Sequence, residues 1–244
     1  MEDIKLKFNK EDRAQIMPIG DIQLGSPTCD EELLKEKIQQ CLQKKIYVIG
    51  MGDWAESGTR SSVGAAVYEQ ILNPQAQIDK LVKLFTPLAE AGLLLYILAG
   101  NHEQRISDSM GIDTAQLIAK LLSVPYLGYC AFVNLIVGKE KYSVYSTHGT
   151  SNAAQVYGKI KAATDIAKIQ DAEITLYAHT HGLFDYSELK YISDDETIDR
   201  HIILTGSFLK YKGSYAEKKG LPPARLGTAL INLYGKKHQI FVSL

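Results

Sequence analysis

Short runs of apolar residues recur along the chain, and each run stops at a small group of polar residues. The runs are rich in β-branched and aromatic residues and are short, which favours buried strands over helices. Each run is written here together with the polar residues at its end. The runs are AQIMPIGD (14–21), IYVIGMGD (46–53), LLLYILAGNH (93–102), YSVYSTHG (142–149) and ITLYAHTH (174–181).

Sequences typical of helices separate these runs. Thr28 and Glu31 fit a capping box ahead of the segment ELLKEKIQQCLQK. Asn73 followed by Pro74 fits an N-cap and a first-turn proline at the start of another helix. Weaker helical patterns cover residues 112–122 and 153–169. The alternation of strand and helix predicts an α/β fold in which the first three strands are parallel.

The last third of the chain has a different pattern. Three segments there read as strands joined by turns: IILTGSFL (202–209), LGTALINLY (226–234) and HQIFVSL (238–244). We expect residues 200–244 to complete a second, more antiparallel sheet. The sequence contains no repeat and no obvious linker, so we expect residues 1–244 to form one domain.

Composition narrows the class of protein. The 27 basic and 28 acidic side chains nearly balance, so no overall field attracts nucleic acid, and any such binding must be local. The three cysteines have no CxxC spacing, which disfavours disulfides and thiolate zinc sites and favours a reducing compartment. The first residues are too charged for a signal peptide, and no apolar run reaches the roughly 18 residues that span a membrane. We expect a cytoplasmic protein without a membrane partner.

The polar residues at the strand ends are the candidates for chemistry, because reactive groups collect at the carboxyl ends of strands in open α/β sheets. Taken singly, each has an ordinary explanation as a turn residue, a helix cap or a buried histidine. Metal-ligating types recur at every predicted end, however, and the H-x-H pair places both imidazoles on one face. The candidates are Asp21, Gln23, Asp53, Asn101, His102, His148, His179 and His181.

The order and spacing of these residues resemble the calcineurin-like metallophosphoesterase family, whose pattern is D-x-H, G-D, G-N-H-[DE], H and G-H-x-H. The matching segments are Asp21-Ile22-Gln23, Gly52-Asp53, Gly100-Asn101-His102-Glu103, His148-Gly149 and Ala178-His179-Thr180-His181. The resemblance spans residues 14–182. It implies a four-layer α/β/β/α sandwich, in which two facing mixed β-sheets are flanked by helices.

The resemblance also implies a role for each residue. One divalent ion would be held by Asp21, Gln23 and His181, the other by Asn101, His148 and His179, with Asp53 between them and with His102 as proton donor oriented by Glu103. In such sites, ions about 3.5–4 Å apart lower the pKa of a bridging water and hold the hydroxide in line with phosphorus. A general acid then protonates the departing alkoxide.

Gln23 departs from the family pattern, which usually has histidine there. An amide oxygen is neutral and harder than imidazole, which favours oxygen-preferring ions. A Mn²⁺-dependent branch of the family that acts on ADP-ribose and CDP-alcohols also carries Asp-x-Gln. We therefore expect two divalent ions, Mn²⁺ ahead of Zn²⁺, Fe or Mg²⁺. The alternative is that Gln23 weakens the first site and leaves a metal-binding scaffold without turnover.

Candidate substrate contacts lie outside the motifs. Arg60 and Arg105 have the chemistry to grip a phosphate. The segment 206–225 carries basic and aromatic residues together, which suits single-stranded nucleic acid or a nucleotide. Its relevant residues are Lys210, Tyr211, Lys212, Tyr215, Lys218, Lys219 and Arg225. The segment also resembles the C-terminal part of small phosphoesterases from phages and prophages. For each residue, a solvated surface position is the competing interpretation.

The function predicted from these features is hydrolysis of a phosphate ester, with a diester favoured over a monoester. A nuclease acting on DNA competes with a hydrolase of nucleotide diphosphates such as ADP-ribose, and a phosphomonoesterase remains an alternative. A serine hydrolase is disfavoured because the sequence has no G-x-S-x-G elbow.

Overall fold

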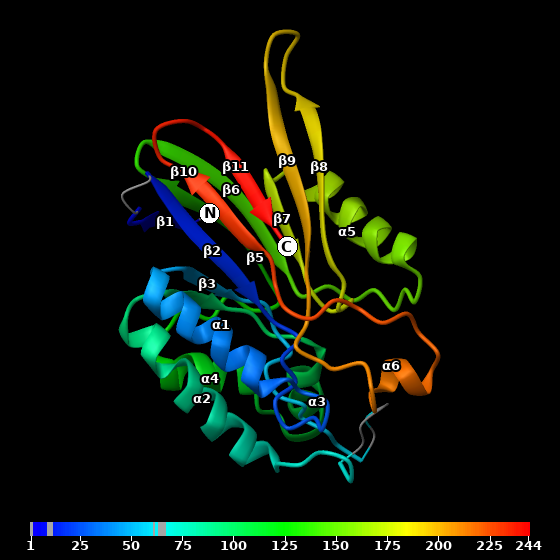
Figure 1. The fold of residues 1–244 in the computed structure, drawn as a ribbon. Coiled ribbons are helices and arrows are strands. Elements are labelled where there is room, and N and C mark those ends of the chain that lie inside the picture. The colour runs from blue at the N-terminus through cyan, green and yellow to red at the C-terminus, as the bar shows by residue number, and fades with distance from the viewer. Residues whose placement is uncertain (1, 9–11, 61, 63–66) are drawn as a thin grey trace.

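The computed structural model of the 244-residue chain describes residues 2–8, 12–60, 62 and 67–244. Two mixed β-sheets face each other, and helices cover the outer face of each sheet (Figure 1). Buried apolar side chains from both sheets form one continuous core between them. The predicted four-layer sandwich is confirmed.

The first sheet, as far as the chain is described, has five strands. Their order across the sheet is β11 (Ile240–Ser243), β10 (Leu230–Tyr234), β2 (Arg13–Ile19), β3 (Tyr47–Gly50) and β4 (Leu94–Ile97). β2, β3 and β4 are parallel, as predicted, and Ile16 lies opposite Tyr47. Every residue of β3 is buried, which explains why this strand reads as a continuous apolar run.

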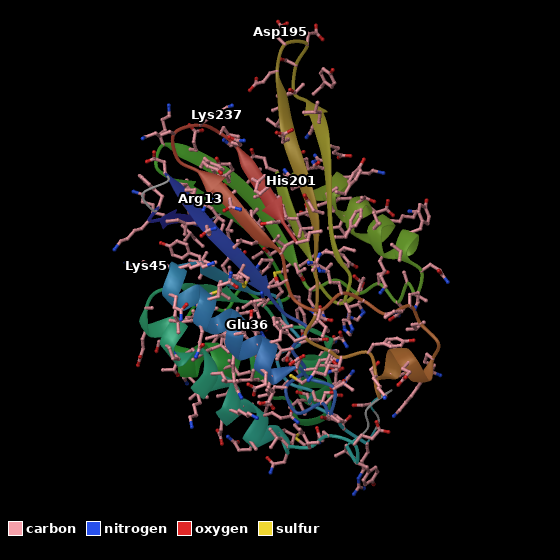
Figure 2. All side chains as sticks on the ribbon, viewed as in Figure 1. Arg13, Glu36, Lys45, Asp195, His201 and Lys237 are labelled. Atoms are coloured by element: carbon pink, nitrogen blue, oxygen red, sulfur yellow. The ribbon has the colours of Figure 1, made fainter. Side chains whose placement is uncertain are left out.

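The second sheet has six strands within the described residues. Their order is β1 (Glu2–Leu6), β5 (Cys130–Val137), β6 (Glu140–Thr147), β7 (Ile174–Tyr177), β9 (Thr197–Thr205) and β8 (Leu183–Tyr191). β6, β7 and β9 are parallel, while β8 and β9 form an antiparallel hairpin. This hairpin extends beyond the neighbouring strands, with Asp195 at its tip (Figures 1 and 2).

The prediction that residues 200–244 complete the second sheet is wrong. β9 pairs with β7 in the six-stranded sheet, but β10 and β11 belong to the five-stranded sheet. β10 runs antiparallel to β2, with Ile231 opposite Ile16. It therefore supplies hydrogen-bond partners to the edge of β2 that β3 leaves open. Residues 206–229 carry the chain from one sheet to the other.

The helices divide unequally between the two faces. They are α1 (Glu31–Lys44), α2 (Pro74–Glu90), α3 (Asn101–Met110), α4 (Thr114–Leu122), α5 (Val156–Gln170) and α6 (Tyr215–Lys218). α1, α2 and α4 pack together outside the five-stranded sheet, and α5 covers β7 and β9 of the other sheet (Figure 1). In the part of the chain that is described, no helix combines the length and apolar character needed to cross a membrane.

The helix caps test two predictions. Asn73 caps α2 as predicted: its side chain accepts a hydrogen bond from the Ala76 backbone N–H at 2.9 Å. The capping box predicted at Thr28 is wrong, because α1 is capped by Asp30, whose carboxylate accepts from the Leu33 N–H at 3.2 Å. The Thr28 hydroxyl instead lies 3.0 Å from that of Ser26, within the turn that precedes the helix.

Trp54 fills the core between the five-stranded sheet and α2. It is fully buried, its ring meets Phe85 edge-on at a centroid distance of 5.0 Å, and its indole N–H donates to the Leu98 carbonyl at 2.9 Å. The ring passes against β3 at Gly50, where an added Cβ would lie 2.2 Å from Trp54 Cζ2. Gly50 is therefore needed for close packing rather than for a turn.

Replacement of Gly50 by alanine tests this packing. Because the core leaves no room for the methyl group, Gly50→Ala is expected to lower the free energy of unfolding by about 1–3 kcal/mol, measured by chemical denaturation. Gly182→Ala is the control, since its Cβ would approach no atom nearer than Leu204 Cδ1 at 3.1 Å. Equal stability of the two variants would contradict the prediction.

Candidate metal centre

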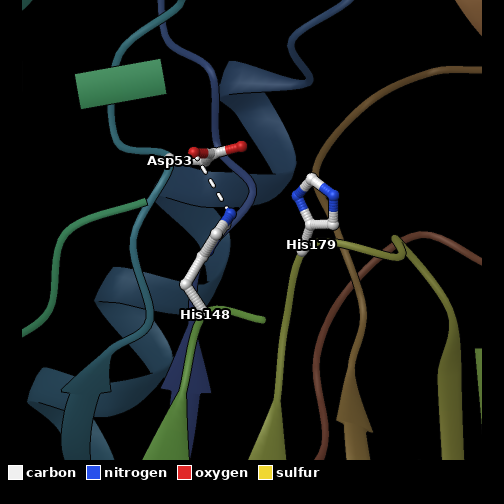
Figure 3. Close-up of side chains that lie close together, drawn as sticks. All are labelled: Asp53, His148 and His179. Atoms are coloured by element: carbon white, nitrogen blue, oxygen red, sulfur yellow. Dashed lines mark ion pairs between the residues drawn. The ribbon is translucent and has the colours of Figure 1, made fainter. Parts of the chain in front are cut away.

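The predicted ligands follow the carboxyl ends of strands in both sheets. Asp21 and Gln23 follow β2, Asp53 follows β3, Asn101 follows β4, His148 follows β6, and His179 and His181 follow β7. The side chains of Asp53, His148 and His179 converge although they come from three strands and two sheets (Figure 3). The site therefore forms where the ends of the two sheets meet.

One set of ligands gathers around Asn101, and we call Asp53, Asn101, His148 and His179 the Asn101 group. The Asn101 amide oxygen lies 3.1 Å from His148 Nε2 and 2.8 Å from His179 Nδ1. His148 Nε2 lies 3.3 Å from Asp53 Oδ1. One ligand atom from each of Asp53, His148 and His179 lies within 4.8 Å of the others. Carboxylate, amide and imidazole atoms at these separations suit a divalent transition-metal ion.

A second set lies beside it, and we call Asp21, Gln23, His181 and the shared Asp53 the Gln23 group. Asp21 Oδ1 lies 3.4 Å from His181 Nε2. The Gln23 amide nitrogen lies 3.5 Å from both Asp53 Oδ2 and His181 Nε2. A half-turn of this amide would present its oxygen to the same two neighbours. The arrangement places Gln23 among the ligands rather than outside them.

The Gln23 group also contains an unsatisfied atom. Asp21 is completely buried, and Oδ2 of its carboxylate accepts from the His179 backbone N–H at 2.9 Å. Oδ1 has no hydrogen-bond partner among the described residues. A buried carboxylate oxygen left in this state is costly unless a cation meets it. The residues present therefore fit a bound metal ion at this group as well.

The backbone at the site is held in an unfavourable conformation. Asp21, Gln23, Asp53, His179 and His181 all have positive φ angles, between 46° and 64°. Residues with a Cβ avoid this region, at a cost of order 1–3 kcal/mol each. Such strain persists where the surrounding structure imposes it, and it is concentrated at functional sites. Five of the ten non-glycine residues with positive φ among the described residues are thus predicted ligands, whereas the ligands Asn101 and His148 are not strained in this way.

The pKa values of the ionisable side chains at the centre depend strongly on one another. Burial would raise the pKa of the Asp53 carboxyl, but the His102 and His148 rings lower it well below its usual value. Burial would lower the pKa of His148, but the Asp53 carboxylate raises it to about 10. The metal-free site at neutral pH therefore contains an ionised Asp53 beside a protonated His148. A metal ion held by His148 and Asp53 would have to displace this proton.

Glu103 has a different role from the one expected. Its carboxylate accepts hydrogen bonds from the backbone N–H groups of Asp53, Trp54 and Gly100, each at 2.9 Å. No hydrogen bond joins it to the His102 ring among the described residues. Burial and the Asp53 charge raise the pKa of Glu103 to about 7. Glu103 thus ties the loop after β3 to the start of α3 and fixes Asp53, and the prediction that it orients His102 is corrected.

The His102 ring is positioned by Glu56 and Arg105. His102 Nδ1 lies 2.8 Å from the Glu56 carbonyl oxygen, which can only accept, so Nδ1 carries a hydrogen. The Arg105 guanidinium lies against both ring nitrogens, with Nη2 2.8 Å from Nε2 and Nη1 3.1 Å from Nδ1. Burial and Arg105, opposed by Asp53, lower the pKa of His102 to about 4. His102 is therefore neutral in this arrangement.

A cavity of about 1130 Å³ opens over the centre. The residues of the candidate metal centre that line this cavity are Gln23, Asp53, Asn101, His102, His179 and His181. The predicted substrate contacts that line it are Arg105, Tyr211, Tyr215, Lys218 and Lys219. Arg60, Lys210 and Lys212 are exposed and are not among the described residues that line it. Lys210 instead lies 3.4 Å from the Asp30 carboxylate.

Sequence reasoning missed two charged residues in the cavity wall. Glu56 is 2% exposed, and burial raises the pKa of its carboxyl to about 7 despite Arg105 at 3.7 Å. Lys159 of α5 donates to the Thr180 carbonyl at 2.7 Å, between the two histidines of the H-x-H pair. No motif marks either residue. Glu56 is distinguished only by its closeness to Asp53 in the sequence. Lys159 is distinguished only by its closeness to the site in space.

No protein-family model and no curated protein matches the chain. Solved structures do, at low identity. They include Vacuolar Protein Sorting 29 from Cryptosporidium parvum (15% identity, 95% of this chain and 97% of that chain, TM-score 0.49). A second is a predicted phosphoesterase from Streptococcus pneumoniae, with 14% identity over 94% of this chain and 88% of that chain and a TM-score of 0.44. A third is a metallophosphoesterase from Sphaerobacter thermophilus, with 14% identity over 94% of this chain and 86% of that chain and a TM-score of 0.40. At these identities and TM-scores the likeness does not decide the chemistry of the site.

Removal of the shared carboxylate tests the centre. A divalent ion present at a hundred times its Kd stabilises a protein by about 2.7 kcal/mol, which is about 5–10 °C in Tm for a chain of this size. We expect Mn²⁺ to raise Tm of the wild type by this amount and Asp53→Asn to abolish the rise. Asp185→Asn is the control, since Asp185 pairs with His201 at 3.1 Å outside the centre. A rise retained in Asp53→Asn would contradict the assignment.

The raised pKa of His148 predicts proton release on metal binding. Below a pH of about 10 the ring of the metal-free protein is protonated, and an ion needs the neutral ring as its ligand. At pH 7 we therefore expect release of about one proton, and an apparent affinity that rises about tenfold per pH unit towards that pKa. Calorimetry in buffers of different ionisation enthalpy counts the protons. Binding without proton release would contradict the coupling of His148 to Asp53.

Proposed function

We propose that the chain is a dinuclear metal-dependent phosphoesterase. The observation that carries this proposal is the sharing of one buried carboxylate, Asp53, by two sets of metal-ligating side chains at the base of a large cavity. A shared carboxylate brings two ions close together, and paired ions are suited to phosphoryl chemistry. His102 beside the centre adds a proton donor or acceptor on the same wall.

Two bound divalent ions would supply an activated water and would neutralise the oxygens of the substrate phosphate. The chain's own residues do the rest. Glu103 fixes Asp53 through the surrounding backbone. Lys159 holds the turn between His179 and His181 through the Thr180 carbonyl. These contacts preorganise the ligands before substrate arrives, which lowers the cost of reorganisation during the reaction.

Arg105 and His102 can change partners when a phosphate enters. Arg105 lies against the neutral His102 ring, whereas an anionic phosphate would offer its guanidinium a bidentate pair of charge-assisted hydrogen bonds. A substrate phosphate would therefore draw Arg105 away and free His102 Nε2 to take up a proton and deliver it to the leaving alkoxide. Glu56, 3.7 Å from Arg105 Nη1, keeps the guanidinium close to both positions.

Within this proposal, we favour a phosphodiester that carries a nucleotide or belongs to a nucleic acid, and Mn²⁺ as the ion. The position of Gln23 among the ligands supports an oxygen-preferring metal. Gln23 also supports the second candidate, a scaffold that binds metal without turnover, because a neutral amide holds an ion less firmly than imidazole does. Hydrolysis of an ADP-ribose-like diphosphate or of a phosphomonoester is the alternative within the enzyme class.

An activity screen on chelator-treated protein separates these functions. Mn²⁺, Zn²⁺ and Mg²⁺ are each added back, and the substrates are bis-p-nitrophenyl phosphate, p-nitrophenyl phosphate, ADP-ribose and single- and double-stranded DNA. The proposal expects activity with Mn²⁺ above that with Zn²⁺ or Mg²⁺, and diester hydrolysis above monoester hydrolysis. Metal binding without hydrolysis of any substrate would favour the scaffold.

His102 provides the test of proton transfer. Loss of a general acid lowers kcat by about 10²–10⁴-fold, so we expect His102→Ala to lose activity to this extent on DNA, whose leaving group is an alkoxide. The Mn²⁺-induced rise in Tm should remain, because His102 is not assigned as a ligand. His238→Ala is the control, since its ring lies 3.3 Å from Glu140, outside the cavity lining. Unchanged kcat in His102→Ala would contradict its assigned role.

A further inference from the structure

The cavity is larger than the reacting phosphate needs. Its volume of about 1130 Å³ exceeds that of sites that enclose drug-sized ligands, roughly 300–1,000 Å³. A phosphate group bound at the metal ligands would fill only a small part of it. The remaining volume is available to the organic portion of a substrate, and its lining indicates which chemistry it would accept.

The wall that faces this volume comes from residues 207–224, the segment that joins the two sheets. It is anchored directly to the site: the Phe208 N–H donates to the Asp21 carbonyl at 3.2 Å. The Lys210 N–H donates to the Thr28 carbonyl at 2.8 Å. These backbone bonds fix the segment relative to the metal ligands. The wall is therefore a built part of the site.

Two tyrosines stand on this wall, and they differ in their surroundings. The Tyr211 hydroxyl donates to the Leu221 carbonyl at 2.9 Å, which holds the segment together. Tyr215, in α6, lines the cavity and is 45% exposed. Lys219 Nζ lies 5.7 Å from the centre of the Tyr215 ring. An exposed aromatic ring beside a lysine is the combination that proteins use to bind single-stranded nucleic acids by stacking.

Exposure increases from the metal ligands towards this wall. Asp53 and His102 are 1% and 6% exposed, whereas Tyr215 is 45% exposed. Arg105 and Lys159 line the cavity together with the predicted ligands and supply positive charge, with the Glu56 carboxylate 3.7 Å from Arg105. A substrate with an anionic phosphate at one end and a flat, neutral ring at the other matches this order. A nucleoside phosphodiester has that structure.

We propose that Tyr215 and Lys219 form a subsite for the nucleoside of a phosphodiester substrate, with the base stacked on the Tyr215 ring. This inference rests on the proposed function, because the reacting phosphate is placed at the metal centre. It extends that function by assigning the outer wall of the cavity to the base. A free nucleotide diester and a single strand of nucleic acid both present a base next to a phosphodiester, so either could occupy the subsite.

A matched pair of esters tests the subsite: the p-nitrophenyl ester of thymidine 5′-monophosphate and methyl p-nitrophenyl phosphate. Both are phosphodiesters with the same leaving group, and they differ only in the nucleoside. Because stacking on an aromatic side chain is lost, Tyr215→Ala should lower the ratio of their kcat/KM values about tenfold. Tyr215→Phe should keep the ratio. Tyr191→Ala, 73% exposed at the end of β8, is the control.

The outcomes separate this inference from the proposed function. A ratio unchanged in Tyr215→Ala, with both esters hydrolysed, would overturn the subsite and leave the function intact. If the wild type hydrolyses neither ester with any metal, the proposed function fails, and saturation-transfer NMR of thymidine 5′-monophosphate on metal-free protein decides the subsite. Transfer to the base protons that Tyr215→Ala removes supports it, whereas equal transfer in both proteins refutes it.

A competition assay distinguishes the two sources of the nucleoside. A short single-stranded DNA is added to the hydrolysis of the thymidine ester by the wild type and by Tyr215→Ala. Inhibition that weakens in Tyr215→Ala assigns the subsite to a polynucleotide strand. If the strand does not compete while the ester ratio still depends on Tyr215, the subsite belongs to small nucleotide diesters.

Discussion

The burial of a negative charge on Asp53 is the constraint on which the site depends. This side chain is 1% exposed, and an isolated carboxylate in such a place is strongly unfavourable. The protein compensates it from two sides: His148 approaches its Oδ1 at 3.3 Å, and the His102 backbone N–H donates to the same oxygen at 2.9 Å. Because these partners come from different sheets, the charge also fixes how the two sheets meet.

The loops that carry the ligands show how the fold meets this requirement. Gly100 approaches Asp53 so closely that a Cβ would lie 2.1 Å from Oδ1. Glu103, in the first turn of α3, accepts from the backbone on both sides of the contact. The left-handed conformations of Asp21 and Asp53 turn each strand end sharply into the site. Local strain is thus offset by a buried network of hydrogen bonds.

The sequence predicted the parallel strands β2, β3 and β4, because parallel buried strands leave a clear pattern. It also predicted Asp53, His148 and His179, whose side chains converge. It missed β1 and β8, whose charged and polar residues are typical of sheet edges, and it also missed the largely buried strand β5 and the helix α3. It assigned the last strands to the wrong sheet, because hydrophobic periodicity does not specify a pairing partner. Glu56 and Lys159 were missed since their importance arises only from tertiary proximity. The roles of Glu103 and Arg105 depended on hydrogen bonds that spacing does not encode.

Trp54 is the single tryptophan of the chain and directly follows Asp53. Its backbone N–H donates to Glu103, the carboxylate that also holds the Asp53 backbone. The indole emission of the whole protein therefore originates next to the centre, in an environment shielded from water. Intrinsic tryptophan fluorescence therefore reports on the centre, because any rearrangement of the loop after β3 alters the surroundings of Trp54.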